Sequence, residues 1–340
     1  MPSAHGRAAV AAALRSARTV LLTSHENGDG DGIGSALGVA RALRRMGARA
    51  EAAFPTPVPA NLRFLPGAGD AAVVDAGSPL PADLASPDLV VAFDCAAEGR
   101  LGALLPAARA ARGFANVDHH ASNEGFGTVR WIDPAYAAAG TMAFDLLGDL
   151  GAPLDRETAL CLYTALATDT GNFAYSNTDP RSHRMAAACL EAGARAEEVT
   201  AALHRGRSAG SWRVEAEAVA RLESTPDGAV AWTTVTRRSL LDHGVAPGDA
   251  PDLVEIPVSL AATRVAFLLT EAEDGRGTRV SLRSRCAVGV HEIARRFGGG
   301  GHPRAAGFTH PGTPGEARDA VLAAVRDALD AAGGLPPQDA

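Results

Sequence analysis

The segment Ser24–Ser35 (SHENGDGDGIGS) most constrains what this chain can fold into. It follows an apolar run, Thr19–Thr23, that predicts a buried strand, and its glycines predict a turn that opens a helix at about Ile33. A short loop of this kind can turn several side chains towards one point. It carries three candidate metal ligands, which are His25, Asp29 and Asp31. The spacing therefore predicts half of a metal site at a strand-to-helix turn.

Other functions of such a loop need spacings that this segment lacks. A dinucleotide-binding turn needs the pattern G-x-G-x-x-G, which does not occur here, and two aspartates would repel a pyrophosphate. A calcium loop aligned from Asn27 places Gly38 at the position where a bidentate glutamate is needed. An acidic, solvated turn stays open as an alternative on this segment alone.

Composition narrows the class of protein. A chain of 340 residues with 46% hydrophobic residues has room for two globular domains, and the absence of a long apolar stretch predicts no membrane span. A net charge of −7 argues against a protein that coats long duplex nucleic acid, but it allows a small phosphorylated ligand at one site. The four cysteines are scattered, with no C-x-x-C pair, which predicts a reduced protein of the cytoplasm.

Residues 19–169 alternate between strand and helix patterns. Four strands are predicted, at Thr19–Thr23, Ala50–Phe54, Asp88–Phe93 and Gly113–Val117. This alternation predicts an α/β fold with a doubly wound, mostly parallel sheet, in which ligands gather at the carboxyl ends of the strands. Candidate ligands follow three of these strands, at His25–Asp31, Asp94 and Asp118–His120.

The next helices are predicted at Thr141–Leu150 and Asp155–Ala167, and Asp169 follows directly. An aspartate at a helix C-terminus is disfavoured by the helix dipole, so Asp169 suggests a compensating cation. A turn-forming role beside Gly171 is the alternative.

The domain organisation is predicted from where the pattern changes. We expect a catalytic domain over residues 1–205, a linker helix within 206–224 and a smaller α+β domain over 225–340. In the last, strands at Ala229–Val235, Arg264–Leu269 and Thr278–Arg283 predict an antiparallel sheet. Thr313 and Glu316 have capping-box spacing at the start of a final helix.

Six side chains form the candidate metal site, all with oxygen or imidazole donors. They are His25, Asp29, Asp31, Asp94, His119 and Asp169. Such a set suits Mn²⁺ or Mg²⁺ better than structural zinc, and it can hold two ions if one carboxylate bridges. Two ions are typical of phosphoryl transfer to water. Asp118 and His120 are then left to support the ligands and to hydrogen-bond the phosphate or the leaving group.

The second domain carries a candidate phosphate site. In Phe297–Gly307 a glycine run, Gly299, Gly300 and Gly301 included, could direct backbone N–H groups at an anion. Side chains that could add donors are His302, Arg304, Arg283 and Arg285. The alternatives are a flexible turn for the glycines and a solvated surface for the arginines.

These motifs resemble those of the DHH phosphoesterase family. His25-x3-Asp29-x-Asp31, Asp94, Asp118-His119-His120 and Asp169-Thr170-Gly171 look like its four motifs, in order and spacing, and Phe297–Gly307 resembles the GGGH motif of its associated C-terminal domain. The resemblance covers nearly the whole chain. The two-domain layout is most similar to the bacterial subfamily that degrades nanoRNA and dephosphorylates 3′-phosphoadenosine 5′-phosphate (pAp).

The resemblance implies which residue does what. It implies one Mn²⁺ held by His25, Asp29 and Asp94, and a second held by Asp31, Asp94, His119 and Asp169. It also implies that His120 assists catalysis, that the second domain holds the nucleotide across an interdomain cleft, and that the protein can form a homodimer. Two departures stand out: Gly28 replaces a frequent proline, and residues 137–144 lack a glutamate that many relatives carry.

The expected function is hydrolysis of short RNA and removal of the 3′-phosphate of pAp. A phosphodiesterase for cyclic or linear dinucleotides would share this catalytic core, so it is the first alternative. A pyrophosphatase would not need the second domain, and a processive exonuclease would need a basic channel. A non-catalytic nucleotide sensor is the alternative from another class, but every expected ligand is present.

Overall fold

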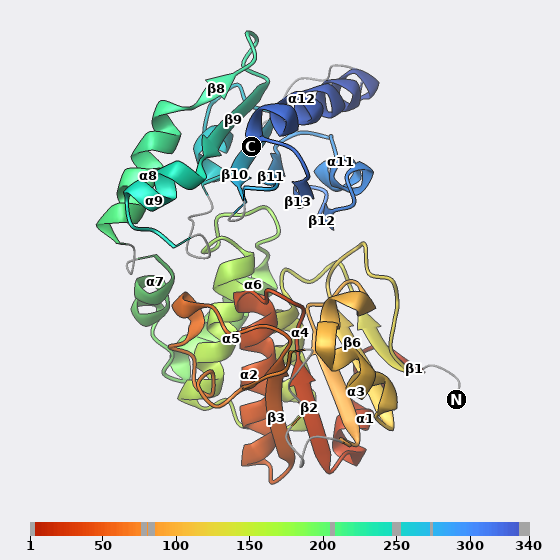
Figure 1. Ribbon diagram of the computed structural model, residues 1–340. Helices are drawn as coiled ribbons and strands as arrows, with labels where there is room; N and C mark the ends of the chain where they lie inside the picture. The colour runs from red at the N-terminus through yellow and green to blue at the C-terminus, as the bar shows by residue number, and fades with distance from the viewer. Residues whose placement is uncertain are drawn as a thin grey trace. The chain divides into compact units, whose positions relative to one another are not determined.

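The computed structural model describes residues 4–75, 80, 86–204, 208–246, 253–272 and 275–332. Two compact units make up the chain, Met1–Gly206 and Arg207–Ala340, and each is described by itself (Figure 1). The predicted boundary after residue 205 lies outside the described residues. Helix α8 (Ala209–Ala220), within the predicted linker, is part of the second unit.

The first unit is built on a parallel sheet of seven strands in the order β1-β7-β6-β5-β2-β3-β4. The strands are β1 (Ala4–His5), β2 (Thr19–Thr23), β3 (Arg49–Phe54), β4 (Ala72–Val73), β5 (Leu89–Phe93), β6 (Gly113–Asp118) and β7 (Val129–Ile132). The neighbouring strands pair in parallel, which confirms the predicted doubly wound sheet. The strand order reverses between β2 and β5, and such a switch point is where parallel sheets bind ligands.

Helices cover the sheet of the first unit. They are α1 (Arg7–Ser16), α2 (Gly30–Arg45), α3 (Leu105–Ala110), α4 (Ala139–Leu150), α5 (Arg156–Asp169), α6 (Pro180–Glu191) and α7 (Ala196–His204), with 3₁₀ turns η1 (Ala60–Leu62) and η2 (Glu98–Leu104). Both faces of the sheet are buried: Leu22 and Val91 belong to one apolar cluster, and Leu21 and Val90 to another. Strands covered on both faces read as continuous apolar runs, as β2 and β5 do.

Helix α2 begins earlier than the sequence predicts. It starts at Gly30 rather than at Ile33, because the Asp29 carboxylate accepts hydrogen bonds from the N–H groups of Asp31 at 3.0 Å and Gly32 at 3.2 Å. Three of the glycines that predicted a turn, Gly30, Gly32 and Gly34, therefore lie inside the helix. A Cβ atom at Gly34 would lie 2.5 Å from the carbonyl oxygen of Cys161, so glycine lets α2 pack closely on α5.

The second unit has a six-stranded sheet in the order β12-β13-β11-β10-β9-β8. The strands are β8 (Glu223–Ser224), β9 (Val230–Val235), β10 (Val265–Glu271), β11 (Thr278–Ser284), β12 (Gly300–Gly301) and β13 (Ala305–His310). Its helices besides α8 are α9 (Arg237–Asp242), α10 (Glu255–Val258), α11 (Val290–Arg296) and α12 (Pro314–Ala331). The capping box that begins α12 is confirmed.

The prediction of an antiparallel second sheet was wrong for one pair. β9 and β10 run parallel, since the long connection that carries α9 and α10 returns the chain to the same end of the sheet. The remaining pairs are antiparallel. Among the described helices of both units, none combines the length and apolar character needed to cross a membrane.

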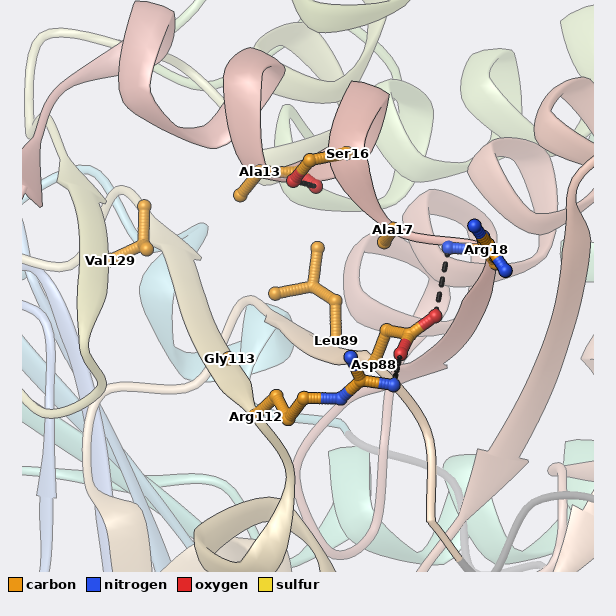
Figure 2. Close-up of a pocket in the computed structure, with 9 residues that line it drawn as sticks. All are labelled: Ala13, Ser16, Ala17, Arg18, Asp88, Leu89, Arg112, Gly113 and Val129. Atoms are coloured by element: carbon orange, nitrogen blue, oxygen red, sulfur yellow. Dashed lines mark hydrogen bonds and ion pairs between the residues drawn. The ribbon is translucent and has the colours of Figure 1, made fainter.

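A cavity of about 490 Å³ lies where β5 and β6 begin, at the edge of the first sheet opposite the predicted ligands. In Figure 2 the Asp88 carboxylate, at its rim, lies between the Arg112 guanidinium and the backbone N–H of Arg18. None of the predicted metal ligands lines this cavity.

Candidate metal centre

The first unit brings all six predicted ligands to the carboxyl edge of its sheet. Two lie one residue beyond a strand, Asp94 after β5 and His119 after β6, and His25 lies two residues beyond β2. Asp29 caps α2, Asp31 lies in its first turn, and Asp169 is the last residue of α5. Four separate segments thus converge at the switch point of the sheet.

The first group of ligand atoms comes from His25, Asp29 and Asp94. One donor atom of each lies within 4.8 Å of the others, and His25 Nε2 is 3.5 Å from Asp94 Oδ2. His25 Nδ1 lies 2.7 Å from the carbonyl oxygen of Glu26 and 2.7 Å from Arg100 Nη2. When Nδ1–H donates to the Glu26 carbonyl, the lone pair of Nε2 is left for a metal ion.

The second group comes from Asp31, His119 and Asp169. His119 Nε2 lies 3.6 Å from Asp31 Oδ2 and 3.6 Å from Asp169 Oδ2. Asp31 is 1% exposed, although it carries a carboxylate. The ligand atoms of Asp31, His119 and Asp169 lie within 4.8 Å of one another, and two carboxylates with one imidazole are a donor set that fits a divalent cation.

Asp94 lies between the two groups. Its Oδ2 atom faces His25, while its Oδ1 atom is 3.5 Å from His119 Nε2. Asp94 also has a φ of +55°, a left-handed conformation that is strained for a residue with a side chain and that is found at functional sites. The sharp turn directs the carboxylate across the end of β5 and gives each group one oxygen.

The groups of the chain itself do not fully compensate the negative charges of the carboxylates in the site. Burial and the nearby charges of Asp94 and Asp169 raise the pKa of Asp31 well above its usual value. Burial likewise raises the pKa of Asp169 to about 7, against the opposing effect of His119. Burial acts in the same direction on Asp94, but hydrogen bonds from His119 and His25 outweigh it and hold that pKa well below its usual range. Divalent cations would let all three carboxylates ionise together.

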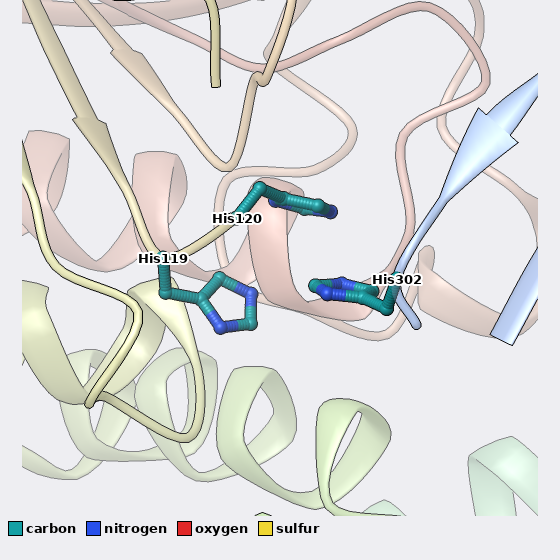
Figure 3. A group of neighbouring side chains, drawn as sticks. All are labelled: His119, His120 and His302. Carbon is teal, nitrogen blue, oxygen red and sulfur yellow. The ribbon is translucent and has the colours of Figure 1, made fainter. Parts of the chain in front are cut away.

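Asp118 supports the two histidines that follow it. Its Oδ1 atom accepts hydrogen bonds from the backbone N–H of His119 at 2.9 Å and from Nδ1 of His120 at 2.8 Å, and its Oδ2 atom accepts one from Asn123 at 2.6 Å. Figure 3 shows the His119 and His120 rings side by side beyond the end of β6, with centroids 5.0 Å apart. Burial lowers the pKa of His120, but Asp118 and Asp94 outweigh it and raise that pKa overall.

A second cavity adjoins the ligands on the side of α2 and α5. It has a volume of about 350 Å³ and is lined by Gly28, Asp29, Gly30, Pro59, Asn61, Leu62, Thr168 and Asp169. A Cβ atom at Gly30 would lie 2.4 Å from the Thr168 side chain, so the close approach of these two segments requires glycine. The cavity offers room for a small ligand beside two of the predicted metal ligands.

The arginines predicted to bind phosphate differ in their surroundings within the second unit. Arg283 Nε lies 3.7 Å from Glu255 Oε1. Arg285 Nη1 donates to two backbone carbonyl oxygens, at the end of α10 and just beyond it, at 3.2 and 3.0 Å. Arg304 is exposed. Arg285 therefore already has a structural task, whereas Arg304 faces solvent.

The glycine run forms a tight hairpin rather than an open loop. β12 pairs with β13, Gly299 N–H donates to the Ala294 carbonyl, and His302 N–H donates to the Ala305 carbonyl. A Cβ atom at Gly299 would lie 2.2 Å from the Gly307 carbonyl oxygen. Close packing of the two strands thus accounts for this glycine, and the amides of Gly298 and Gly299 already have acceptors.

Sequence reasoning missed the asparagines and amides that hold the ligands. Asn123 bonds Asp118 from five residues away, and Asn177 bonds Asp169 from eight residues away. The N–H groups of Ala139 and Gly140 donate to Asp31 from more than a hundred residues away. An asparagine shortly after a predicted ligand is a usable local signal, but the amide contacts depend on the tertiary fold.

Comparisons with known proteins agree with this geometry. Residues 19–166 match the DHH family, N-terminal domain, and residues 228–331 match the DHHA1 domain. A Thermus thermophilus protein named bifunctional oligoribonuclease and PAP phosphatase NrnA is 35% identical over 318 residues, which cover 93% of this chain and 92% of that protein. A Bacillus subtilis protein of the same name is 23% identical over 194 residues, 56% of this chain and 60% of that protein.

Among solved structures, an exopolyphosphatase-related protein from Bacteroides fragilis has a similar fold. The TM-score is 0.83 at 22% sequence identity, with 95% of each chain covered. At this identity the likeness concerns the fold.

Proposed function

The chain belongs to the DHH family of phosphoesterases, and on that premise we propose that it hydrolyses short oligoribonucleotides and removes the 3′-phosphate of pAp. The Thermus relative, which is named for both activities, supports this substrate class because its similarity extends over 93% of the chain. A net charge of −7 also favours short substrates over long duplexes.

One observation carries the proposal: the two oxygens of Asp94 face two separate groups of ligand atoms. We assign one ion to His25, Asp29 and Asp94, and a second to Asp31, Asp94, His119 and Asp169. These oxygen and imidazole donors favour Mn²⁺, with Mg²⁺ as the alternative. When bound, two such ions would supply positive charge to the phosphoester and lower the pKa of a water molecule.

His120 and Asp118 have a different task. Asp118 accepts the hydrogen bond from His120 Nδ1 at 2.8 Å, which fixes the ring; in the imidazolium form Nε2 carries a proton as well and can donate. His120 then holds a proton at Nε2 and hydrogen-bonds the phosphate or the leaving oxygen of the substrate. Asn123 keeps Asp118 in place through its bond to Oδ2.

Substrate recognition is assigned to the second unit. Arg283, His302 and Arg304, together with the amides of β12, are proposed to contact the phosphate or the nucleoside. Arg285 is expected to contribute less, because two backbone carbonyls already accept from its guanidinium. The cysteines at the described positions are all free and buried, which supports a reducing compartment such as the cytoplasm. The homodimer stays a prediction for sedimentation analysis.

A product assay tests the function. The purified chain is incubated with Mn²⁺ and, separately, with pAp, a series of short RNAs, and cyclic and linear dinucleotides. We expect phosphate from pAp and mononucleotides from the short RNAs. Cleavage confined to dinucleotides would replace the proposed substrate class. Tight nucleotide binding without any product would instead support a sensor.

A further inference from the structure

One short segment contacts two ligands of the second group directly and is linked to the third through one side chain. Residues Tyr136–Gly140 include the loop that precedes α4 and the first two residues of that helix. Asp31 and His119 form hydrogen bonds with this segment directly. Asp169 is linked to it through the side chain of Asn177, which has no role in the proposed mechanism. We call Tyr136–Gly140 the positioning segment.

The positioning segment holds Asp31 with two backbone amides. Ala139 N–H donates to Oδ2 at 2.6 Å and Gly140 N–H donates to Oδ1 at 2.7 Å, so both carboxylate oxygens are fixed. These amides are the first of helix α4, where the helix dipole favours an anion. A Cβ atom at Gly140 would lie 2.6 Å from the Ala165 side chain, so only glycine lets the amide come this close.

The same segment orients His119 and is itself anchored. His119 Nδ1 lies 3.2 Å from the Tyr136 carbonyl oxygen, which directs Nε2 towards the carboxylates. The Tyr136 hydroxyl donates to Asp145 at 2.9 Å, and Arg181 lies over the ring at 4.2 Å. The Trp131 ring packs edge-on at 5.4 Å. With three partners around its side chain, Tyr136 presents a rigid carbonyl to the ligand.

Asn177 connects Asp169 to the positioning segment. Its side-chain N–H₂ group donates to the Ala137 carbonyl oxygen at 3.0 Å and to the Asp169 carbonyl oxygen at 3.0 Å, and it lies 3.5 Å from Asp169 Oδ2. Asp169 ends α5, where carbonyl groups have no partner within the helix. One amide therefore caps α5 and ties its last residue to the loop that holds the other two ligands.

We propose that Asn177 is a positioning residue for the second metal ion, acting with the positioning segment on Asp31, His119 and Asp169. This inference rests on the proposed two-metal function. The first group is held by other elements: Asp29 by the N-terminus of α2, and His25 by the Glu26 carbonyl. Loss of Asn177 should therefore weaken one ion and spare the other.

Metal binding itself provides the test, without substrate. Metal-free wild type and Asn177→Ala are titrated with Mn²⁺ by calorimetry, and the bound ions are followed by electron paramagnetic resonance. Wild type should bind two ions with a magnetically coupled signal. Asn177→Ala should keep one ion at wild-type affinity and bind the other about 10–100-fold more weakly, with the uncoupled signal of a single ion at intermediate Mn²⁺. Ser176→Ala, on the same exposed loop, is the matched control and should titrate as wild type.

Two further measurements keep the outcome clear. Thermal unfolding of the metal-free proteins shows whether Asn177→Ala folds. Asn177→Asp, in which the side chain has nearly the same size, also removes the N–H₂ donor and should cause the same selective loss of affinity for one ion. Two ions bound at wild-type affinity in both variants would overturn the proposal, as would an equal loss at both sites. If wild type binds two ions but cleaves no nucleotide, the proposed function fails while the role of Asn177 is still decided.

Discussion

Helix α5 and strand β5 each have an aspartate at both ends. The groups that face these carboxylates differ between the two ends of the first unit. Asp155 caps the start of α5 and Asp169 ends it. Asp88 precedes β5 and Asp94 follows it. The carboxyl end of the sheet, with Asp94 and Asp169, is called the site end, and the opposite end, with Asp88 and Asp155, is called the far end.

At the far end, the chain supplies its own positive partners. Asp155 is paired with Arg41, whose Nε and Nη2 atoms lie 3.1 and 3.0 Å from its oxygens. Burial acts to raise the pKa of Asp155, but Arg41 and the Thr158 N–H outweigh it and lower that pKa to about 2. Asp88 accepts from the backbone N–H groups of residues 18 and 19, and these bonds lower its pKa.

At the site end, histidines and other carboxylates take the place of arginine. The ion-pair partners of Asp94 are His25, His119 and His120, and the pKa of Asp169 is raised to about 7. An acid at a helix C-terminus also opposes the helix dipole, which Asp155 at the N-terminus does not. The difference teaches that the carboxylates at the far end are compensated by groups of the chain itself, while those at the site end would be compensated by the proposed cations.

The largest expected effect compares the two ends of β5. Asp94→Asn removes the carboxylate that both ligand groups share, so hydrolysis of pAp and short RNA should fall by at least about 10³-fold in kcat/KM. Asp88→Asn keeps an oxygen for the two backbone N–H groups and should stay within about twofold of wild type, since it lies far from the site. Both variants are assayed at saturating Mn²⁺ for phosphate released from pAp and mononucleotides released from short RNA. Equal losses would remove the distinction between the two ends.

Chelation of the metal ions should have the second-largest effect. It should lower the Tm of the first unit alone. A ligand present at 100 times its Kd stabilises the folded state by about 2.7 kcal/mol, which corresponds to roughly 5–10 °C in Tm for a unit of this size. Calorimetric scans with Mn²⁺ and with EDTA should show this shift, and Asp94→Asn should lose it while Asp88→Asn keeps it. An equal shift in the Tm of the second unit would contradict the assignment of the ions to the first unit.

The third prediction concerns acid stability at the far end. The lowered pKa of Asp155 corresponds to about 2 kcal/mol at most, and solvent screening reduces this, so Asp155→Ala should cost roughly 1–2 kcal/mol at pH 7. Because the folded pKa lies below the unfolded value, the contribution is complete above about pH 4 and is lost as the pH falls towards 2. Urea unfolding at pH 7 and pH 3 should therefore show a smaller cost at pH 3. Asp155→Asn keeps a capping oxygen and should cost about half as much.

Much of this contrast could be predicted from the sequence, because its signals are local. Apolar runs predicted the strands, and the residues just beyond them predicted that His25, Asp94 and His119 would lie at one edge. The unfavourable position of Asp169 at the end of a helix was visible in the same way. Spacing along the chain and the geometry of parallel sheets were sufficient for these residues.

What the sequence did not reveal depends on contacts between distant segments. The early start of α2 follows from Asp29 acting as a cap, a role that its metal-ligand pattern concealed. The parallel pairing of β9 and β10 depends on where a long connection returns the chain. The bonds from Ala139 and Gly140 to Asp31 join residues that no periodicity relates. Such features are properties of the assembled fold.

The smallest expected effect tests whether the cavity of about 490 Å³ at the far end has a function. Arg112 pairs with Asp88 there, but its side chain is 85% exposed, so solvent and salt screen the pair. Arg112→Ala should leave the Tm, the Mn²⁺ affinity and the KM for pAp unchanged, because Asp88 keeps its bonds to two backbone N–H groups. A changed KM would show that ligands reach this cavity. An unchanged KM is expected, because the Asp88 carboxylate already pairs with the Arg112 guanidinium that would otherwise bind an anion. In this unit the size of a cavity therefore does not show where hydrolysis takes place.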